Sequence, residues 1–203
     1  MYKVQTLNKI SAIGLDKFPR DNYEIASEFQ NPDAVIVRSF GMLEMDIPAS
    51  VKSIARAGAG VNNIPIPKCT ERGIVVFNTP GANANAVKEL VFAGMFLSAR
   101  NLFDSMKWTE SIKGKGDEVP KLVEKEKSKF AGSEIRGKTL GVIGLGAIGV
   151  MVANDAIAMG MDVIGFDPYI SVDNAWGLDS KVHKAISLDH LLSESDYITV
   201  HVP

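Results

Sequence analysis

Short apolar runs alternate with turn residues over the first 80 positions of the chain. Four of these runs predict strands, at residues 4–7, 34–37, 52–56 and 74–77. Runs of about four residues that are apolar on both faces are typical of strands buried in a parallel sheet. Residues 65–72 fit a helix that ends before Gly73, since glycine readily adopts the left-handed conformation that follows helix ends. The pattern therefore predicts an α/β layer structure.

The middle of the chain is first apolar and then polar. Residues 83–100 predict one long helix with too many apolar positions for a surface helix, so the helix is either buried or part of an interface. Residues 101–129 contain a glycine-rich turn and a run of charges. They predict a solvated loop with an exposed helix, and we assign no chemistry to them.

A second series of strands and helices begins after Gly137. Strands are predicted at residues 138–143, 163–166 and 197–202, and helices at 147–159 and 187–192. Ser187 suits the N-cap of the last helix because its hydroxyl can accept from a free backbone N–H.

Three glycines lie between the first of these strands and the helix that follows it. Gly144 permits a tight turn, Gly146 lets a pyrophosphate approach the backbone, and Gly149 lets the helix pack closely on the strand. The helix N-terminus offers free N–H groups and a positive dipole end to phosphates. A glycine triplet alone is weak evidence, but here the next strand ends in Asp167, 23 residues after Gly144. The order predicts a dinucleotide-binding βαβ unit.

Asp167 indicates which dinucleotide binds. Its carboxylate can accept from both hydroxyls of the adenosine ribose, whereas it would repel a 2′-phosphate, and no arginine follows directly. The sequence therefore favours NAD over NADP. The alternative is a glycine-tightened turn without a ligand, with Asp167 as a strand-end cap.

Composition excludes several other functions. The chain has 22 basic and 24 acidic residues, a balance that offers no footprint for nucleic acid or an anionic membrane. No apolar run reaches the roughly 18 residues of a membrane span. The single cysteine, Cys69, has no partner and lies in no Cys/His cluster, so we expect a buried reduced thiol, a cytoplasmic protein and no metal site.

The quoted motifs resemble a known family. Residues 137–149, 165–169 and 196–203 are similar to the signatures of the D-2-hydroxyacid dehydrogenases. Residues 37–39, 55–64 and 78–85 resemble the substrate domain of the branch that oxidises D-3-phosphoglycerate. The resemblance implies a flavodoxin-like substrate-binding domain over residues 1–82. It also implies an incomplete Rossmann NAD-binding domain over residues 83–203, which includes the interdomain helix 83–100.

The resemblance also implies roles for individual residues. Substrate-binding positions are Arg38, Arg56, Asn83, Arg100 and the turn around Gly58. Cofactor-binding positions are Gly144, Gly146, Ala147, Ile148, Gly149 and Asp167, with Val202 and Pro203 lining the adenine pocket. Guanidinium groups suit an anionic substrate because they bind carboxylate and phosphate through two parallel hydrogen bonds. Taken singly, each arginine is equally typical of solvated surface charge.

The family's later Arg, Glu and His cannot be assigned, so we expect no catalytic residue in this chain. His183 and His190 are expected on the surface, and His201 is not expected to be catalytic. We therefore expect a chain truncated before its catalytic residues and inactive alone. Two alternatives to phosphoglycerate oxidation stay open: another 2-hydroxyacid dehydrogenase, such as a glyoxylate/hydroxypyruvate reductase, and a non-catalytic NAD-sensing scaffold like the related corepressors. The apolar helix and the segment after it predict a homodimer or a higher homo-oligomer.

Overall fold

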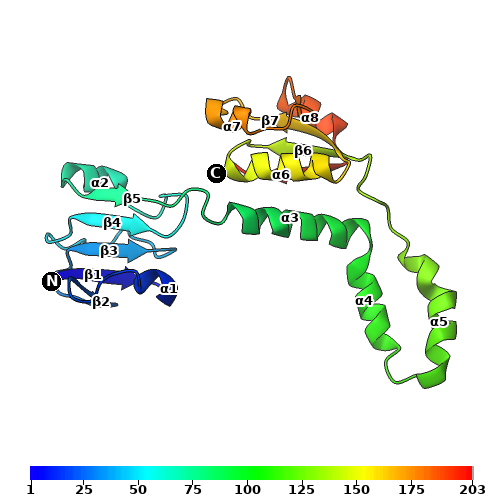
Figure 1. The fold of residues 1–203 in the computed structure, drawn as a ribbon, viewed down its shortest axis with the longest axis horizontal. Coiled ribbons are helices and arrows are strands. Elements are labelled where there is room, and N and C mark those ends of the chain that lie inside the picture. The colour runs from blue at the N-terminus through cyan, green and yellow to red at the C-terminus, as the bar shows by residue number, and fades with distance from the viewer. Residues whose placement is uncertain (203) are drawn as a thin grey trace. The chain divides into compact units, whose positions relative to one another are not determined.

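The computed structural model of this protein describes residues 1–202. The chain forms two compact units, Met1–Asn83 and Ala84–Pro203 (Figure 1). Each unit contains its own parallel sheet, and the expected α/β class is confirmed.

The first unit contains a five-stranded sheet in the order β2-β1-β3-β4-β5, in which all neighbours are parallel. Its elements are β1 (Tyr2–Leu7), α1 (Ala12–Leu15), β2 (Tyr23–Ala26), β3 (Ala34–Val37), β4 (Ser53–Arg56), α2 (Ile66–Glu71) and β5 (Val75–Phe77). The four predicted strands are present. Strand β2 was not predicted, because its four residues include Glu24 and form no apolar run.

One apolar cluster forms the core of this unit. Val35 and Val37 of β3 and Ile54 of β4 are fully buried, and they pack with Met42 and Cys69. Burial raises the pKa of the Cys69 thiol, while the charge of Arg72 partly opposes the shift. A neutral buried thiol is a poor nucleophile, so Cys69 acts as a small apolar side chain.

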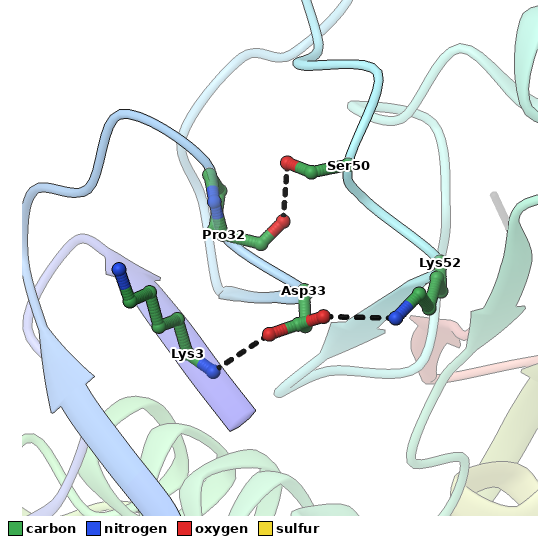
Figure 2. Close-up of polar contacts among 5 residues, drawn as sticks. All are labelled: Lys3, Pro32, Asp33, Ser50 and Lys52. Atoms are coloured by element: carbon green, nitrogen blue, oxygen red, sulfur yellow. Dashed lines mark hydrogen bonds and ion pairs between the residues drawn. The ribbon is translucent and has the colours of Figure 1, made fainter. Parts of the chain in front are cut away.

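A polar junction joins the amino ends of three strands in this sheet (Figure 2). Asp33 Oδ2 accepts from the Lys3 backbone N–H at 2.9 Å, and Oδ1 accepts from Lys52 Nζ at 2.9 Å. Ser50 Oγ donates to the Pro32 carbonyl oxygen at 2.7 Å. The Lys3 N–H bond and Lys52 hold the pKa of Asp33 below its ordinary value. The carboxylate thus connects β1, β3 and β4 at the end opposite their carboxyl termini.

The second unit contains a four-stranded parallel sheet in the order β8-β7-β6-β9. Its sheet elements are β6 (Thr139–Ile143), α6 (Ala147–Ala158), β7 (Asp162–Phe166), α7 (Val172–Trp176), β8 (His183–Lys184), α8 (Leu188–Glu194) and β9 (Tyr197–Val200). Leu140 and Val142 pack into the core with α6, whereas a Cβ on Gly141 would overlap Leu191 of α8. Because successive residues of a strand point to opposite faces, α6 and α8 cover opposite faces of the sheet.

Helix α3 (Ala84–Ala99) is buried on one side only. Phe92 and Met95 pack into the core, whereas Leu90 is 72% exposed and Leu97 is 45% exposed. Burial on all sides, one of the two predictions for this helix, is therefore wrong within this chain. The other prediction, an interface, stays a prediction. Lys88 pairs with Asp155 of α6 at 2.6 Å and ties the helix to the sheet unit.

Residues 101–131 form an arm that leaves and re-enters the unit at one place. The arm contains α4 (Leu102–Ser111), η1 (Gly116–Glu118), α5 (Val119–Glu126) and η2 (Lys127–Phe130), so the expected solvated loop is largely helical. Asn101 begins the arm in a left-handed conformation (φ 49°), and its Nδ2 donates to the Ala131 carbonyl oxygen at 2.9 Å. The Ser133 N–H donates to the Ala99 carbonyl oxygen at 2.9 Å.

Candidate functional site: a glycine turn and an arginine-flanked loop

The glycine turn at the carboxyl end of β6 has the geometry that its sequence predicts. Gly144 has φ +89°, and a Cβ there would lie 2.7 Å from Val202 Cγ1 and 2.9 Å from the His201 carbonyl oxygen. A Cβ on Gly149 would overlap the Gly144 carbonyl oxygen. Two of the three glycines are therefore required by backbone conformation and close packing, whatever the turn binds.

Gly146 differs from the other two glycines because a Cβ there would meet nothing within 4 Å. It faces open space at the start of α6. No side chain caps this end of the helix within residues 1–202, so the N–H groups of Ala147 and Ile148 have no protein acceptor. An open, uncapped helix N-terminus fits a pyrophosphate, which can accept from these N–H groups and interact with the helix dipole.

Asp167, just beyond β7, is held beside this turn. Its Oδ2 accepts from the Leu145 N–H at 2.8 Å, and its Oδ1 accepts from the Tyr169 N–H at 2.8 Å. A carboxylate offers about four acceptor positions, so both oxygens can still accept from ribose hydroxyls. The side chain is only partly buried and remains reachable by a ligand.

A cavity of about 540 Å³ lies next to Asp167. Pro168, Ile170, Ala185 and Ile186 form much of its apolar wall. The sequence did not single out these residues, because they become neighbours only when β8 pairs with β7. Val202, predicted to line the adenine pocket, lies against Gly144 and not in this cavity. Pro203 is outside the described residues.

The histidines offer no evident base at the turn. His201 Nε2 lies 2.9 Å from Thr199 Oγ1, and burial lowers the pKa of its imidazole, which favours the neutral ring. His183 lies in edge strand β8, and His190 lies in α8 on the other side of the sheet from α6.

Three of the predicted substrate residues, Arg38, Arg56 and Gly58, lie together at the carboxyl ends of β3 and β4. Arg38 follows β3 directly, and Arg56 ends β4, where its register partner is Val37. Arg56 Nε donates to the Arg38 carbonyl oxygen at 3.1 Å, and its Nη1 donates to the Gly60 carbonyl oxygen. The Arg38 side chain is exposed and forms no hydrogen bond within residues 1–202. A Cβ on Gly58 would lie 3.5 Å from the Arg56 guanidinium.

Asn83 and Arg100 are placed differently. Asn83 is exposed at the end of the first unit. Arg100 follows α3 and lines a hollow of about 330 Å³ with Glu134, Arg136 and Met159. Met159 caps the carboxyl end of α6, whose 12 residues span about 18 Å from the glycine turn. Within its own unit, Arg100 therefore lies far from the predicted cofactor turn, and its role toward the substrate stays a prediction.

Comparison with known proteins agrees with this geometry. Residues 92–203 match the model of the D-isomer specific 2-hydroxyacid dehydrogenase, NAD binding domain. The chain belongs to this family. Its cofactor is accordingly NAD, as the sequence predicted.

Relatives and solved structures extend the similarity over nearly the whole chain. D-3-phosphoglycerate dehydrogenase of Archaeoglobus fulgidus is 38% identical over 89% of this chain and 32% of its own length. Hydroxypyruvate reductase of Thermotoga maritima is 41% identical over 84% of this chain and 51% of its own length. The NAD⁺-bound 3-phosphoglycerate dehydrogenase of Entamoeba histolytica gives a TM-score of 0.71 at 26% identity, over 100% of this chain and 63% of that one. The chain thus spans about a third to a half of these curated relatives.

Residues 1–202 contain neither a cluster of metal-binding side chains nor a membrane-spanning helix. No group of three or more His, Cys, Asp or Glu side chains is arranged to hold a metal ion. None of the described helices combines the length and apolar character needed to cross a membrane.

Proposed function

We propose that the complete protein oxidises D-3-phosphoglycerate with NAD to 3-phosphooxypyruvate, the reaction that opens serine biosynthesis. The observation that carries the proposal is the pair of arginines at adjacent strand ends around a glycine-rich turn. A substrate with a carboxylate and a phosphate needs several positive groups or N–H donors; Arg38 and Arg56 supply the charge and the turn supplies N–H donors in the same place. The phosphoglycerate dehydrogenases among the relatives support the choice of substrate.

The residues of this chain would bind and orient the reactants. The α6 N-terminus and Gly146 would hold the pyrophosphate, and Asp167 the adenosine ribose. When bound, NAD supplies the acceptor for the hydride that leaves the hydroxyl-bearing carbon. Arg38, Arg56 and Arg100 would hold the acidic groups of the substrate, and Asn83 would contact the substrate through its side-chain amide. No described residue is assigned as the base that takes the hydroxyl proton.

A second candidate is reduction of hydroxypyruvate, or of glyoxylate, by the same chemistry in reverse. The 41% identity to the hydroxypyruvate reductase of Thermotoga maritima supports this second candidate. Both candidates use the same cofactor and a carboxylate-binding turn. They differ in the phosphate, so the question is whether a second anionic group of the substrate is bound.

We also propose that the complete protein is a cytoplasmic homodimer. The exposed apolar residues Leu90 and Leu97 of α3 and Leu102, Phe103 and Met106 of the arm support it, because surfaces of this kind are typical of interfaces. Light scattering at micromolar concentration should give twice the monomer mass. A monomeric mass would contradict the proposal.

The substrate is tested with the complete gene product. We expect NAD reduction with D-3-phosphoglycerate, and we expect Arg38→Gln to raise KM for this substrate far more than KM for NAD. Glycerate, which lacks the phosphate, should be a poor substrate for the wild type. Turnover of glycerate or hydroxypyruvate with none of D-3-phosphoglycerate would favour the second candidate. NAD binding without turnover of any hydroxy acid would favour a non-catalytic NAD-sensing scaffold.

A further inference from the structure

Three successive carbonyl groups in the loop after β4 are each held by a different donor. The Gly58 oxygen accepts from the Thr79 N–H at 3.0 Å, and the Ala59 oxygen accepts from Asn78 Nδ2 at 2.6 Å. The Gly60 oxygen accepts from Arg56 Nη1. Two of the donors come from the loop after β5, so this hydrogen bonding joins two neighbouring loops at the carboxyl edge of the sheet (Figure 1).

A held carbonyl also orients the N–H group that follows it. The peptide unit is planar and trans, so its C=O and N–H point in opposite directions. The three held carbonyls therefore fix the N–H groups of Ala59, Gly60 and Val61. None of these three N–H groups has a protein acceptor in the described part of the chain, whereas the Ala57 N–H donates to the Val37 carbonyl oxygen at 2.8 Å. The free donors thus begin after Ala57, and we call Ala59, Gly60 and Val61 the anion turn.

We propose that Asn78 is a positioning residue that orients the anion turn toward the substrate carboxylate. The inference rests on the proposed function, because it assumes that this turn receives the substrate. Successive free N–H groups form a concave site for anions, provided that the backbone is held in one conformation. A loop that had to be ordered on binding would lose affinity to conformational entropy.

Asn78 is the member of this arrangement that can be tested alone. The Thr79 donor is a backbone group, and the Arg56 side chain also brings positive charge to the site. Arg56 is itself fixed by the turn, since a Cβ on Gly60 would lie 2.9 Å from its Nη1. Asn78 is uncharged and touches the turn through one hydrogen bond to a carbonyl. It also borders a cavity of about 370 Å³, so a longer side chain finds room there.

The experiment measures carboxylate binding at the turn directly by NMR. The ¹⁵N-labelled 203-residue chain is titrated with D-3-phosphoglycerate and with D-glycerate, and the amide signals of the anion turn are followed. In the wild type these signals should shift and saturate. Asn78→Ala should weaken the affinity about 5- to 10-fold, the effect of losing one hydrogen bond that orders the site. Asn78→Gln retains the amide donor and should restore most of the affinity.

Two measurements separate a positioning role from general damage. Asn31→Ala removes an exposed asparagine before β3, at the opposite edge of the sheet, and should bind like the wild type. The affinity for NAD, whose predicted site lies in the other unit, should be unchanged in every variant. If Asn78→Ala does not fold, Asn78→Ser replaces it, because its hydroxyl is too short to reach the Ala59 oxygen.

The outcomes distinguish the inference from the function on which it rests. Equal affinity of wild type, Asn78→Ala and Asn78→Ser would overturn the positioning role and leave the substrate site intact. Absence of any shift in the wild type at millimolar carboxylate would overturn the anion turn itself, and with it this inference. A decrease in affinity in Asn78→Gln as large as that in Asn78→Ala would also contradict the proposed hydrogen bond.

Discussion

Replacement of Asp167 by asparagine tests most directly whether this residue recognises the adenosine ribose of NAD. The carboxylate already accepts from the Leu145 and Tyr169 N–H groups, each at 2.8 Å. The amide of the variant would keep one oxygen, but its NH₂ group would face one of these two N–H donors, and the negative charge would be lost. Charge-assisted hydrogen bonds to the ribose hydroxyls are worth about 1–3 kcal/mol in total. We therefore expect Asp167→Asn to weaken NAD binding by roughly 5- to 150-fold.

The two cofactors distinguish ribose recognition from simple damage to the turn. A 2′-phosphate is repelled by the wild-type carboxylate and not by the amide. The affinity for NADP should therefore stay constant or rise in Asp167→Asn while that for NAD falls. Both affinities are measured by isothermal titration at constant ionic strength, with Asp162→Asn as a control. Asp162 is an exposed carboxylate at the amino end of β7, so its removal changes the net charge equally and leaves the site intact. An equal loss for NAD and NADP would refute the argument.

Three further substitutions test interactions that stabilise the fold, and a fourth, Gly94→Ala, serves as a control. The Cβ of Gly149→Ala would overlap the Gly144 carbonyl oxygen, so we expect the free energy of unfolding in urea to fall by about 1–3 kcal/mol. Gly94 has open space around it, so Gly94→Ala should leave this free energy unchanged or raise it. Lys88→Met removes the ion pair with Asp155 and should cost up to about 1 kcal/mol in the same assay at low salt, with a smaller effect at about 1 M salt. Folding lowers the pKa of Asp33, so the stabilisation that its carboxylate gives is present above the ordinary pKa of 3.8 and is lost as the pH falls through the folded pKa. Asp33→Asn should therefore lower the melting temperature at neutral pH, whereas at the lowest pH the variant and the wild type should melt at nearly the same temperature. An equal difference in melting temperature at both pH values would contradict this.

The glycine turn could be predicted from sequence because its requirements are local. A strand, a tight turn and a helix follow one another within about 20 residues. Each glycine is needed because a side chain at its position would disturb the turn, the approach of a ligand or the packing of the helix on the strand. The structure shows two of these local requirements, the positive φ of Gly144 and the closeness of Gly149 to the Gly144 carbonyl oxygen, and it shows open space at Gly146. The Ser187 N-cap was predicted for the same reason, and its hydroxyl accepts from the His190 N–H at 3.1 Å.

The elements that the sequence missed lack a pattern of their own. Strand β2 contains a glutamate, and β8 is a two-residue edge strand, His183–Lys184. Each becomes a strand only because a parallel neighbour supplies its hydrogen bonds. Helix α3 was predicted, but the sequence left open whether its apolar positions are buried or lie in an interface, since a count of apolar positions does not show which of them meet a partner.

The sequence by itself determined the α/β class, the glycine turn between β6 and α6 and the position of the acid at the end of the next strand, because these depend on residues close together in the chain. The tertiary structure alone decided what depends on distant partners. It brought the Asn78 side chain to the Ala59 carbonyl oxygen and the Arg56 side chain to the Arg38 carbonyl oxygen. It also placed Arg100 at the end of α6 that is far from the glycine turn. Side chains contact one another across a sheet only after strand order and register are set, and neither is encoded by any single segment.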